Sequence, residues 1–473
     1  DRYFIEKFAE RIWLLEDGTI RDFACGYQKY RSILEHEAAA KPVIPAAPKP
    51  TPRRRRPTKQ QVFKEKHLPL IILGVAGLLC LSFIFGSVSM NQERAAAKAK
   101  EARITELLQQ EADDLKARAA AMAAEYDYEN AMKLLANYSG GLANHEELLS
   151  LYNGYKQALA ELVVWDDFSK IPNLSFRTLV ADLGKATADP TRGSRYGKRY
   201  ITTDEFTRIL EQLYANGYVL VSPYDIAVPT TGDDGSVGVR RSSIRLPEGK
   251  KPIILTQEGV NYYSHMEASG GFADELAIGS NGELTCIKGG EEGAFDLVPL
   301  LNAFLAEHPD FSYEGARATI AVCGYEGLFG MELSRAEEIK AVADKLRAQG
   351  YDIACYTYAD MEYADYGVAG LKEDMEKWFS QIQPILGDVD ILVYPTGGDV
   401  QGQEAYSGSK YEALHGYGFR YFIGTADGTL WGMTTADYAR QHRTIVTAQN
   451  LQSNPEWFAG LFDAATVLSG DRG

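Results

Sequence analysis

The chain has 473 residues, of which 45% are hydrophobic and 24% charged, and its 49 Lys and Arg against 65 Asp and Glu give a net charge of −16. This composition is typical of a folded globular protein and excludes a disordered or collagen-like chain. The length allows two to four domains and excludes a single small one. The acidic total argues against a nucleic-acid binder, which needs a basic face for phosphates.

The charge is distributed unevenly along the chain. Residues 1–67 carry 15 Lys and Arg against 9 Asp and Glu, a net of +6, so residues 68–473 carry a net of −22. Between these parts, Leu68–Met90 contains no charged residue. At about 1.5 Å per residue this segment can cross a hydrocarbon core of roughly 30 Å. We predict a single transmembrane helix over 68–90, in preference to a buried core helix or a cleaved signal peptide.

Basic residues precede the predicted span. Residues 36–67 form a Pro/Ala/Arg-rich basic linker that includes Arg53, Arg54, Arg55 and Arg56, whereas the chain after residue 90 becomes acidic. Because the basic flank of a span stays cytoplasmic, we expect a cytoplasmic N-terminus and an extracytoplasmic C-terminal domain at the cell membrane. The basic run should also attract anionic membrane lipid.

Residues 91–164 show apolar residues at helical spacing. The pattern predicts a helical stalk, with helices near Tyr128–Asn137 and His145–Leu162. A tetratricopeptide-like array is the alternative, but a single partial repeat cannot close a core.

From residue 165 onward, short apolar runs alternate with amphipathic segments. The predicted strands are Tyr218–Ser222, Pro252–Thr256, Ala318–Cys323, Asp352–Tyr356, Asp390–Tyr394, Tyr421–Gly424 and Thr444–Thr447. The predicted helices are Thr203–Asn216, Phe295–His308, Arg335–Gln349, Lys372–Leu386 and Lys410–Gly416. This alternation indicates an α/β domain over 165–473 with a parallel sheet, and the number of units favours a barrel.

Four segments carry a family resemblance: Thr202–Ser222, Lys250–Thr256, His308–Ser312 and Ile391–Pro395. In this order they resemble the polysaccharide deacetylase family, carbohydrate esterase family four, over residues 171–449. The resemblance implies a distorted (β/α) barrel that removes N-acetyl groups from chitin-like or peptidoglycan sugars.

The two motifs that hold the catalytic groups in that family are altered in this chain. Glu258 stands at the position of the general base, while Gly259, Tyr356 and Asp360 stand at the positions of the metal ligands. The family mechanism uses a metal-bound water, and these residue types supply a poor ligand set. We therefore expect no bound metal, no other cofactor and a catalytically degenerate site.

Aromatic and amide residues follow the predicted strands, at the end of a barrel where active sites lie. The resemblance and these positions together predict a substrate-binding cleft formed by Gln257, Asn261, Tyr262, Tyr356, Tyr394, Pro395 and Asp399. Tyr rings can stack on sugars, but any single Tyr can equally be a packing residue of the barrel.

Together these features predict a membrane-anchored, extracytoplasmic polysaccharide deacetylase-like protein of a bacterial cell wall. Its expected partner is cell-surface polysaccharide or peptidoglycan. One alternative is a divergent metal-dependent deacetylase that uses Glu258 and Asp360 with a divalent cation, which leaves open whether the protein is an enzyme. Another alternative is a structural or interaction module.

Residues 1–35 resemble the C-terminal end of an ATP-binding-cassette protein of family F, including a strand at Arg11–Leu15 and a turn at Asp17-Gly18. No phosphate-binding loop of the Gly-x-x-x-x-Gly-Lys-Ser/Thr type occurs, so we do not expect ATP binding. A ribosome-associated ATPase fragment would require such a loop upstream. The first residue is Asp1 rather than Met, which leads us to expect preceding sequence.

Overall fold

A computed structural model describes residues 12–16, 19–23, 64–232, 235–470 and 472. The chain divides into two units, Asp1–Ala96 and Ala97–Gly473. The first unit contains β1 (Ile12–Glu16) paired antiparallel with β2 (Thr19–Phe23), which confirms the strand predicted near Leu15. The remainder of the cassette-like segment and the linker to residue 63 lie outside the described residues.

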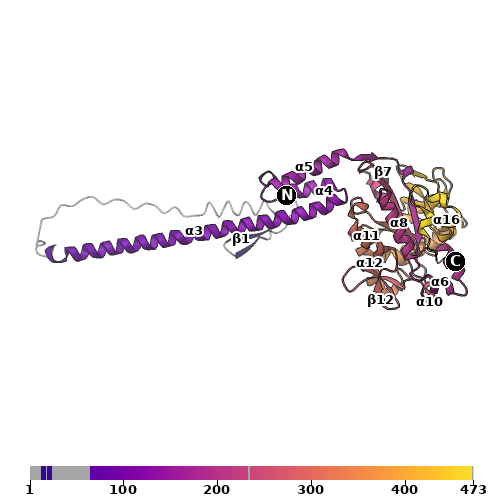
Figure 1. Ribbon diagram of the computed structural model, residues 1–473, viewed down its shortest axis with the longest axis horizontal. Coiled ribbons are helices and arrows are strands. Elements are labelled where there is room, and N and C mark those ends of the chain that lie inside the picture. The colour runs from indigo at the N-terminus through magenta and orange to yellow at the C-terminus, as the bar shows by residue number, and fades with distance from the viewer. Residues whose placement is uncertain (1–11, 17–18, 24–63, 233–234, 471, 473) are drawn as a thin grey trace. The chain divides into compact units, whose positions relative to one another are not determined.

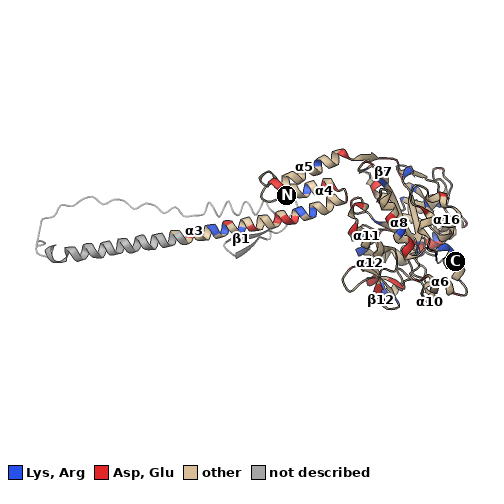
Figure 2. Ribbon diagram, viewed as in Figure 1, with Lys and Arg blue, Asp and Glu red and all other residues tan. Residues whose placement is uncertain are grey.

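The predicted membrane span falls within the long helix α3 (Lys64–Ala124). The backbone of this segment is helical, but its side chains before Met90 lie outside the described residues. Among the residues that are described, no helix combines the length and apolar character needed to cross a membrane. Beyond Met90, α3 carries charged side chains of both signs (Figure 2). The span at 68–90 therefore stays a prediction.

The second unit begins with packed helices. The end of α3 packs against α4 (Tyr128–Ala136) and α5 (Glu146–Glu161), which confirms both helices predicted there (Figure 1). Their buried cluster includes Leu115 of α3, Leu135 of α4 and Leu148 of α5. These helices consequently have a small apolar core of their own.

The remainder of this unit is built on a closed parallel barrel. In the part of the chain that the structure describes, its seven strands are β4 (Asn173–Arg177), β9 (Lys251–Glu258), β13 (Ala318–Val322), β14 (Asp352–Cys355), β15 (Ile391–Val393), β16 (Tyr421–Thr425) and β18 (Ala439–Ile445). Their order is β13-β14-β15-β16-β18-β4-β9, and pairing of β9 with β13 closes the circuit. The predicted α/β barrel is confirmed.

The sequence reading of the strands needs three corrections. It did not predict β4, whose sequence Asn-Leu-Ser-Phe-Arg contains no apolar run because three of its five residues are polar. It placed the last strand at Thr444, whereas β18 begins at Ala439. The strand predicted at Tyr218 is β5 (Tyr218–Leu220), which pairs with the start of β9 and lies outside the closed circuit.

Five helices pack around the barrel where the sequence predicts helices. They are α8 (Thr203–Ala215), α11 (Leu297–Glu307), α12 (Ala336–Ala348), α13 (Val368–Lys377) and α15 (Ser409–Gly416). α13 continues through a π-helical turn, Trp378–Ile382, into α14 (Gln383–Leu386). A capping box of Thr202 and Glu205 sets the start of α8.

Shorter elements complete the unit. The strands are β3 (Val163–Trp165), β6 (Ala227–Thr231), β7 (Val237–Arg241), β8 (Ile244–Leu246), β10 (Glu275–Ile278), β11 (Leu284–Lys288), β12 (Glu291–Gly293) and β17 (Gly432–Thr434). The helices are α6 (Leu183–Ala188), α7 (Gly193–Arg199), α9 (Pro223–Ile226), α10 (Ser264–Ser269), α16 (Ala448–Ser453) and α17 (Ala464–Val467), with 3-10 turns at Leu142–Asn144, Phe168–Lys170, Pro309–Phe311, Leu333–Arg335, Pro395–Gly397 and Pro455–Phe458.

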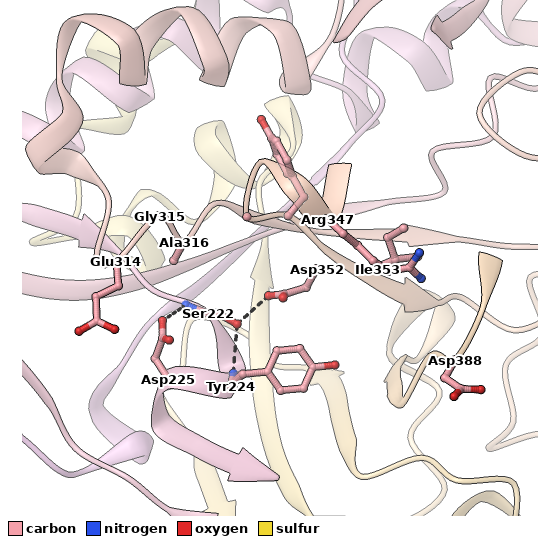
Figure 3. A pocket seen from close by; sticks show the side chains of 12 residues that line it. Ser222, Tyr224, Asp225, Glu314, Gly315, Ala316, Arg347, Asp352, Ile353 and Asp388 are labelled. Carbon is pink, nitrogen blue, oxygen red and sulfur yellow. Dashed lines mark hydrogen bonds between the residues drawn. The ribbon is translucent and has the colours of Figure 1, made fainter. Parts of the chain in front are cut away.

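An acidic pocket of about 330 Å³ lies where β14 begins, at the N-terminal face of the barrel (Figure 3). Ser222 Oγ donates to Asp352 Oδ2 at 2.8 Å, and the backbone N–H of Ser222 donates to Asp225 at 2.7 Å. Desolvation raises the pKa of Asp352 to about 7, with a further contribution from Asp390. Desolvation likewise raises the pKa of Asp225 to about 7.

These two carboxyls should make stability depend on pH. Each binds its proton more tightly in the folded chain than in the unfolded one, so the free energy of unfolding should fall between about pH 4 and pH 7 and level off above. Asp352→Asn should remove part of this fall and raise the free energy of unfolding by about 1–3 kcal/mol at pH 8. Urea unfolding of the full chain across this range measures the effect.

The matched control is Asp388→Asn, which removes an exposed carboxylate of the same pocket. Its free energy of unfolding should vary with pH in the same way as that of the unaltered protein. If the free energy of unfolding of Asp352→Asn varies with pH as steeply as that of the unaltered protein, Asp352 does not cause this pH dependence.

Candidate functional site

The carboxyl ends of the barrel strands surround a mouth whose floor contains Glu258, at the end of β9. Its Oε1 accepts a hydrogen bond from Arg443 Nε at 2.7 Å and another from Ser175 Oγ, and its Oε2 accepts one from Tyr356 Oη at 3.0 Å. The Glu258 side chain is only 1% exposed. Both carboxylate oxygens are therefore occupied by protein donors.

Arg443, on β18, ties this carboxylate to the neighbouring strands. Its guanidinium also donates to the backbone oxygens of Ile423 at 2.9 Å, Gly424 at 3.0 Å and Tyr394 at 2.8 Å. Burial by itself would raise the pKa of Glu258, but Arg443 and Arg177 outweigh it and lower the pKa to about 2. To accept a proton from a ligand, Glu258 would have to break this ion pair. Its predicted role as a base stays a prediction.

The three positions at which the family holds its metal do not form a metal site here. Gly259 has φ +62° and supplies no side-chain donor, and the Tyr356 hydroxyl donates to Glu258. Asp360 is exposed at the rim, where desolvation raises its pKa to about 6 against the lowering effect of Arg177. Within the described residues, no group of three or more His, Cys, Asp and Glu side chains is arranged to hold a metal ion. This donor set does not fit a divalent cation.

Three residues predicted to bind substrate face the helices rather than the mouth. Gln257 Nε2 donates to Asp296 Oδ1 at 2.8 Å, and the Tyr262 hydroxyl donates to Asp296 Oδ2 at 2.7 Å. The hydroxyl of Tyr394 lies 3.0 Å from that of Tyr406. All three side chains are buried, so they pack between the sheet and its helices.

The other predicted contacts hold the loops of the mouth. Asn261 Nδ2 donates to the backbone oxygens of Cys323 at 2.7 Å and Gly327 at 2.6 Å, which fixes the loop after β13. Asp399 accepts from Arg440 Nη2 at 2.9 Å, and Pro395 is buried. Direct contacts of these residues with a ligand stay predictions.

Two pockets open in the mouth. One, of about 470 Å³, is lined by Arg177, Arg192, Arg195, Tyr200, Tyr263, Ser264, His265, Tyr325, Glu326, Ala359 and Asp360. The other, of about 420 Å³, is lined by Arg177, Arg199, Glu362, Thr396, Ile445, Thr447, Gln449 and Asn450. Both volumes lie in the range of small-molecule sites. Arg177, at the end of β4, lines both.

Several loops of the mouth contain residues in the left-handed region of φ, which is costly for residues other than Gly. Six such residues follow β9, β13, β14 or β15: Tyr262, Glu326, Phe329, Thr357, Asp360 and Thr396. Buried Asp374 of α13 holds the loop after β14, because its carboxylate accepts from the backbone N–H groups of Tyr358 at 2.8 Å and Ala359 at 2.9 Å. These strained loops are fixed by specific bonds.

Sequence reasoning missed most residues that line the larger pocket. It did not single out Arg177, Arg192, Arg195 or Tyr200, and it interpreted His265 as a surface or core residue. A usable signal was present, because Arg192–Arg199 contains four basic residues within an acidic domain. Of the positions named from the family motifs, the structure places Asp360 at this pocket.

No family model matches the chain, and no curated protein matches it. Neither the deacetylase nor the cassette resemblance is therefore supported by a family model. Among solved structures, the chain is similar to that of the Streptococcus pyogenes deacetylase PplD in complex with acetate. The match covers 62% of this chain and 97% of that chain, at 13% identity and a TM-score of 0.34. The barrel assignment rests on the strand pairing.

Removing one partner of the buried ion pair should be strongly destabilising. Arg443→Met would leave the Glu258 carboxylate charged and unpaired, and we expect the free energy of unfolding to fall by about 3–5 kcal/mol. Adding Glu258→Gln should restore part of that loss, because the uncompensated charge is then gone. Denaturant unfolding of the two variants measures both values.

The control is Arg335→Met, because the Arg335 side chain is 38% exposed and pairs at the surface with Glu275 at 2.6 Å and Glu338 at 2.7 Å. It should cost about 1 kcal/mol or less. If Arg443→Met and Arg335→Met lower the free energy of unfolding equally, the buried pair contributes no more to stability than the exposed one, which would contradict the prediction.

Proposed function

We propose that this chain is a membrane-anchored, extracytoplasmic protein that binds cell-surface glycan in the mouth of a deacetylase-like barrel without deacetylating it. The single observation that carries the proposal is the ion pair of Glu258 with Arg443. A carboxylate whose two oxygens accept protein hydrogen bonds, and whose pKa is lowered to about 2, is a poor proton acceptor near neutral pH.

The lining of the larger pocket suits a sugar. Tyr200, Tyr263 and Tyr325 line it, and Tyr325 is 54% exposed. Aromatic faces pack against the apolar faces of pyranose rings, while Ser264, Asp360 and other polar groups can bond hydroxyls. This combination supports binding of polysaccharide or peptidoglycan.

The membrane anchor is part of the same proposal. It is supported by the uncharged stretch Leu68–Met90 and the Arg-rich linker before it. The helical backbone of α3 through this stretch is compatible with a span. Fractionation of cells expressing the full chain, with protease added from outside, tests the anchor and the side on which the barrel lies.

Glycan binding without turnover is the expected result for the full chain purified in mild detergent. Chitotriose and a peptidoglycan disaccharide should bind in calorimetry, with no acetate released when Zn²⁺, Co²⁺ or Mn²⁺ is added. Tyr325→Ser should weaken binding by about five- to tenfold, because one aromatic contact is lost. Tyr366→Ser is the control, since Tyr366 is 45% exposed and lines neither mouth pocket.

If the full chain releases acetate and Glu258→Ala does not, the proposal of a non-catalytic protein is overturned and the divergent deacetylase is favoured. A full chain that binds no glycan and releases no acetate would instead favour the structural or interaction module.

A further inference from the structure

Arg177 differs from the other arginines deep in this unit. Arg440, Arg443 and Arg472 are each paired with a carboxylate and bonded to backbone oxygens. Among the described residues, Arg177 has no ion pair within 4 Å, and its Nε is buried without a hydrogen-bond partner. Its closest ring contact is Tyr200, with the guanidinium carbon 5.9 Å from the ring centroid.

Desolvation alone would lower the pKa of the half-buried Arg177, but the nearby Glu258 carboxylate outweighs it and raises the pKa. Buried charges in proteins are normally paired, because desolvation is repaid only by an opposite charge or by hydrogen bonds. The Glu258 carboxylate contributes attraction but directs its oxygens to Arg443, Ser175 and Tyr356. Arg177 therefore has free donors at the point where the two pockets of the mouth meet.

Further arginines lie beside it on one short element. Arg192 and Arg195 line the larger pocket and Arg199 the smaller one, on α7 and the residue before it. Among the described residues none of the three has a side-chain ion pair, although residues 68–473 carry a net charge of −22. Four arginines thus line the two mouth pockets of an otherwise acidic protein.

The carboxylates of the mouth stand on other loops. Glu326 and Asp360 line the larger pocket and are exposed, and Glu362 lines the smaller pocket and is half-buried. Glu326 already accepts the backbone N–H of Ser264 at 2.9 Å. Around an anion bound to Arg177, the arginines lie on and just before α7, whereas the carboxylates lie on the loops after β13 and β14. This separation of charge favours one orientation of the ligand.

We infer that the mouth recognises a glycan bearing an anionic substituent, a carboxylate or a phosphate, whose charge is bound by Arg177 with support from Arg195. This inference rests on the proposed glycan-binding function. The planar guanidinium can donate two parallel hydrogen bonds to either anion, which a neutral hydroxyl cannot match.

The test uses the full chain in detergent and three trisaccharides in calorimetry: trigalacturonate, its carboxyl-reduced neutral counterpart, and the neutral trimer phosphorylated at one hydroxyl. At least one anionic trimer should bind about tenfold or more tightly than the neutral one, and added NaCl should reduce that preference. The stronger of the two anionic trimers identifies the substituent.

Arg177→Gln should abolish the preference for the anion and leave binding of the neutral trimer within about twofold. Arg195→Gln, on the exposed side of α7, should reduce the preference even if the first variant folds poorly. The control is Arg241→Gln on β7, which makes the same charge change beside Ala227, near the start of β16 at the opposite face of the barrel. This variant should change neither the affinity for the trimers nor the preference for the anion.

Equal affinity for the neutral and anionic trimers would overturn the inference and leave glycan binding intact. A preference for the anion that survives both Arg177→Gln and Arg195→Gln would also overturn it. If chitotriose or the peptidoglycan disaccharide binds and none of the three trimers does, the inference is overturned and the proposed function stands. If neither those two glycans nor any of the trimers binds, the proposed function is overturned, and the inference with it.

Discussion

The buried ion pair of Glu258 with Arg443 is the interaction on which the barrel and its mouth both depend. Through Ser175 and Tyr356 the carboxylate reaches β4 and the end of β14, while the guanidinium reaches backbone oxygens on β16 and at the end of β15. One pair thereby connects nearly the whole circuit of strands. The cost of desolvating two charges is tolerable because almost every donor and acceptor of the pair is satisfied.

The same pair determines what chemistry the mouth can perform. The Glu258 oxygens are held by protein donors, and Gly259 beside it offers no side chain. The negative charge of Glu258 nevertheless lowers the cost of placing Arg177 nearby without direct contact. The mouth thus presents the guanidinium of Arg177, which has no ion pair among the described residues, beside a carboxylate whose oxygens are already bonded.

The sequence was sufficient for the barrel and its helices because hydrophobic periodicity depends on local burial. It failed where the interior is polar: β4 carries Asn173, Ser175 and Arg177 toward other polar groups, so no apolar run identified it. The sequence also could not show which side of the sheet each residue at the end of a strand faces. Gln257 and Glu258 are adjacent, yet they face opposite sides of the sheet because side chains alternate along a strand. Only one of the two can face the mouth, so the prediction that placed both there could not hold for both residues.

Each end of the barrel strands contains a feature that costs stability. At the carboxyl ends, Thr357 and Asp360 persist in the left-handed region because Asp374 bonds the backbone of their loop. Glu326 and Phe329 persist there because Asn261 bonds the backbone of theirs. At the amino ends, the half-buried Asp225 and Asp352 have raised pKa values and weaken the fold as they ionise. The apolar core between the two ends must offset both costs, so a substitution that weakens the central ion pair should loosen the mouth and the acidic pocket together.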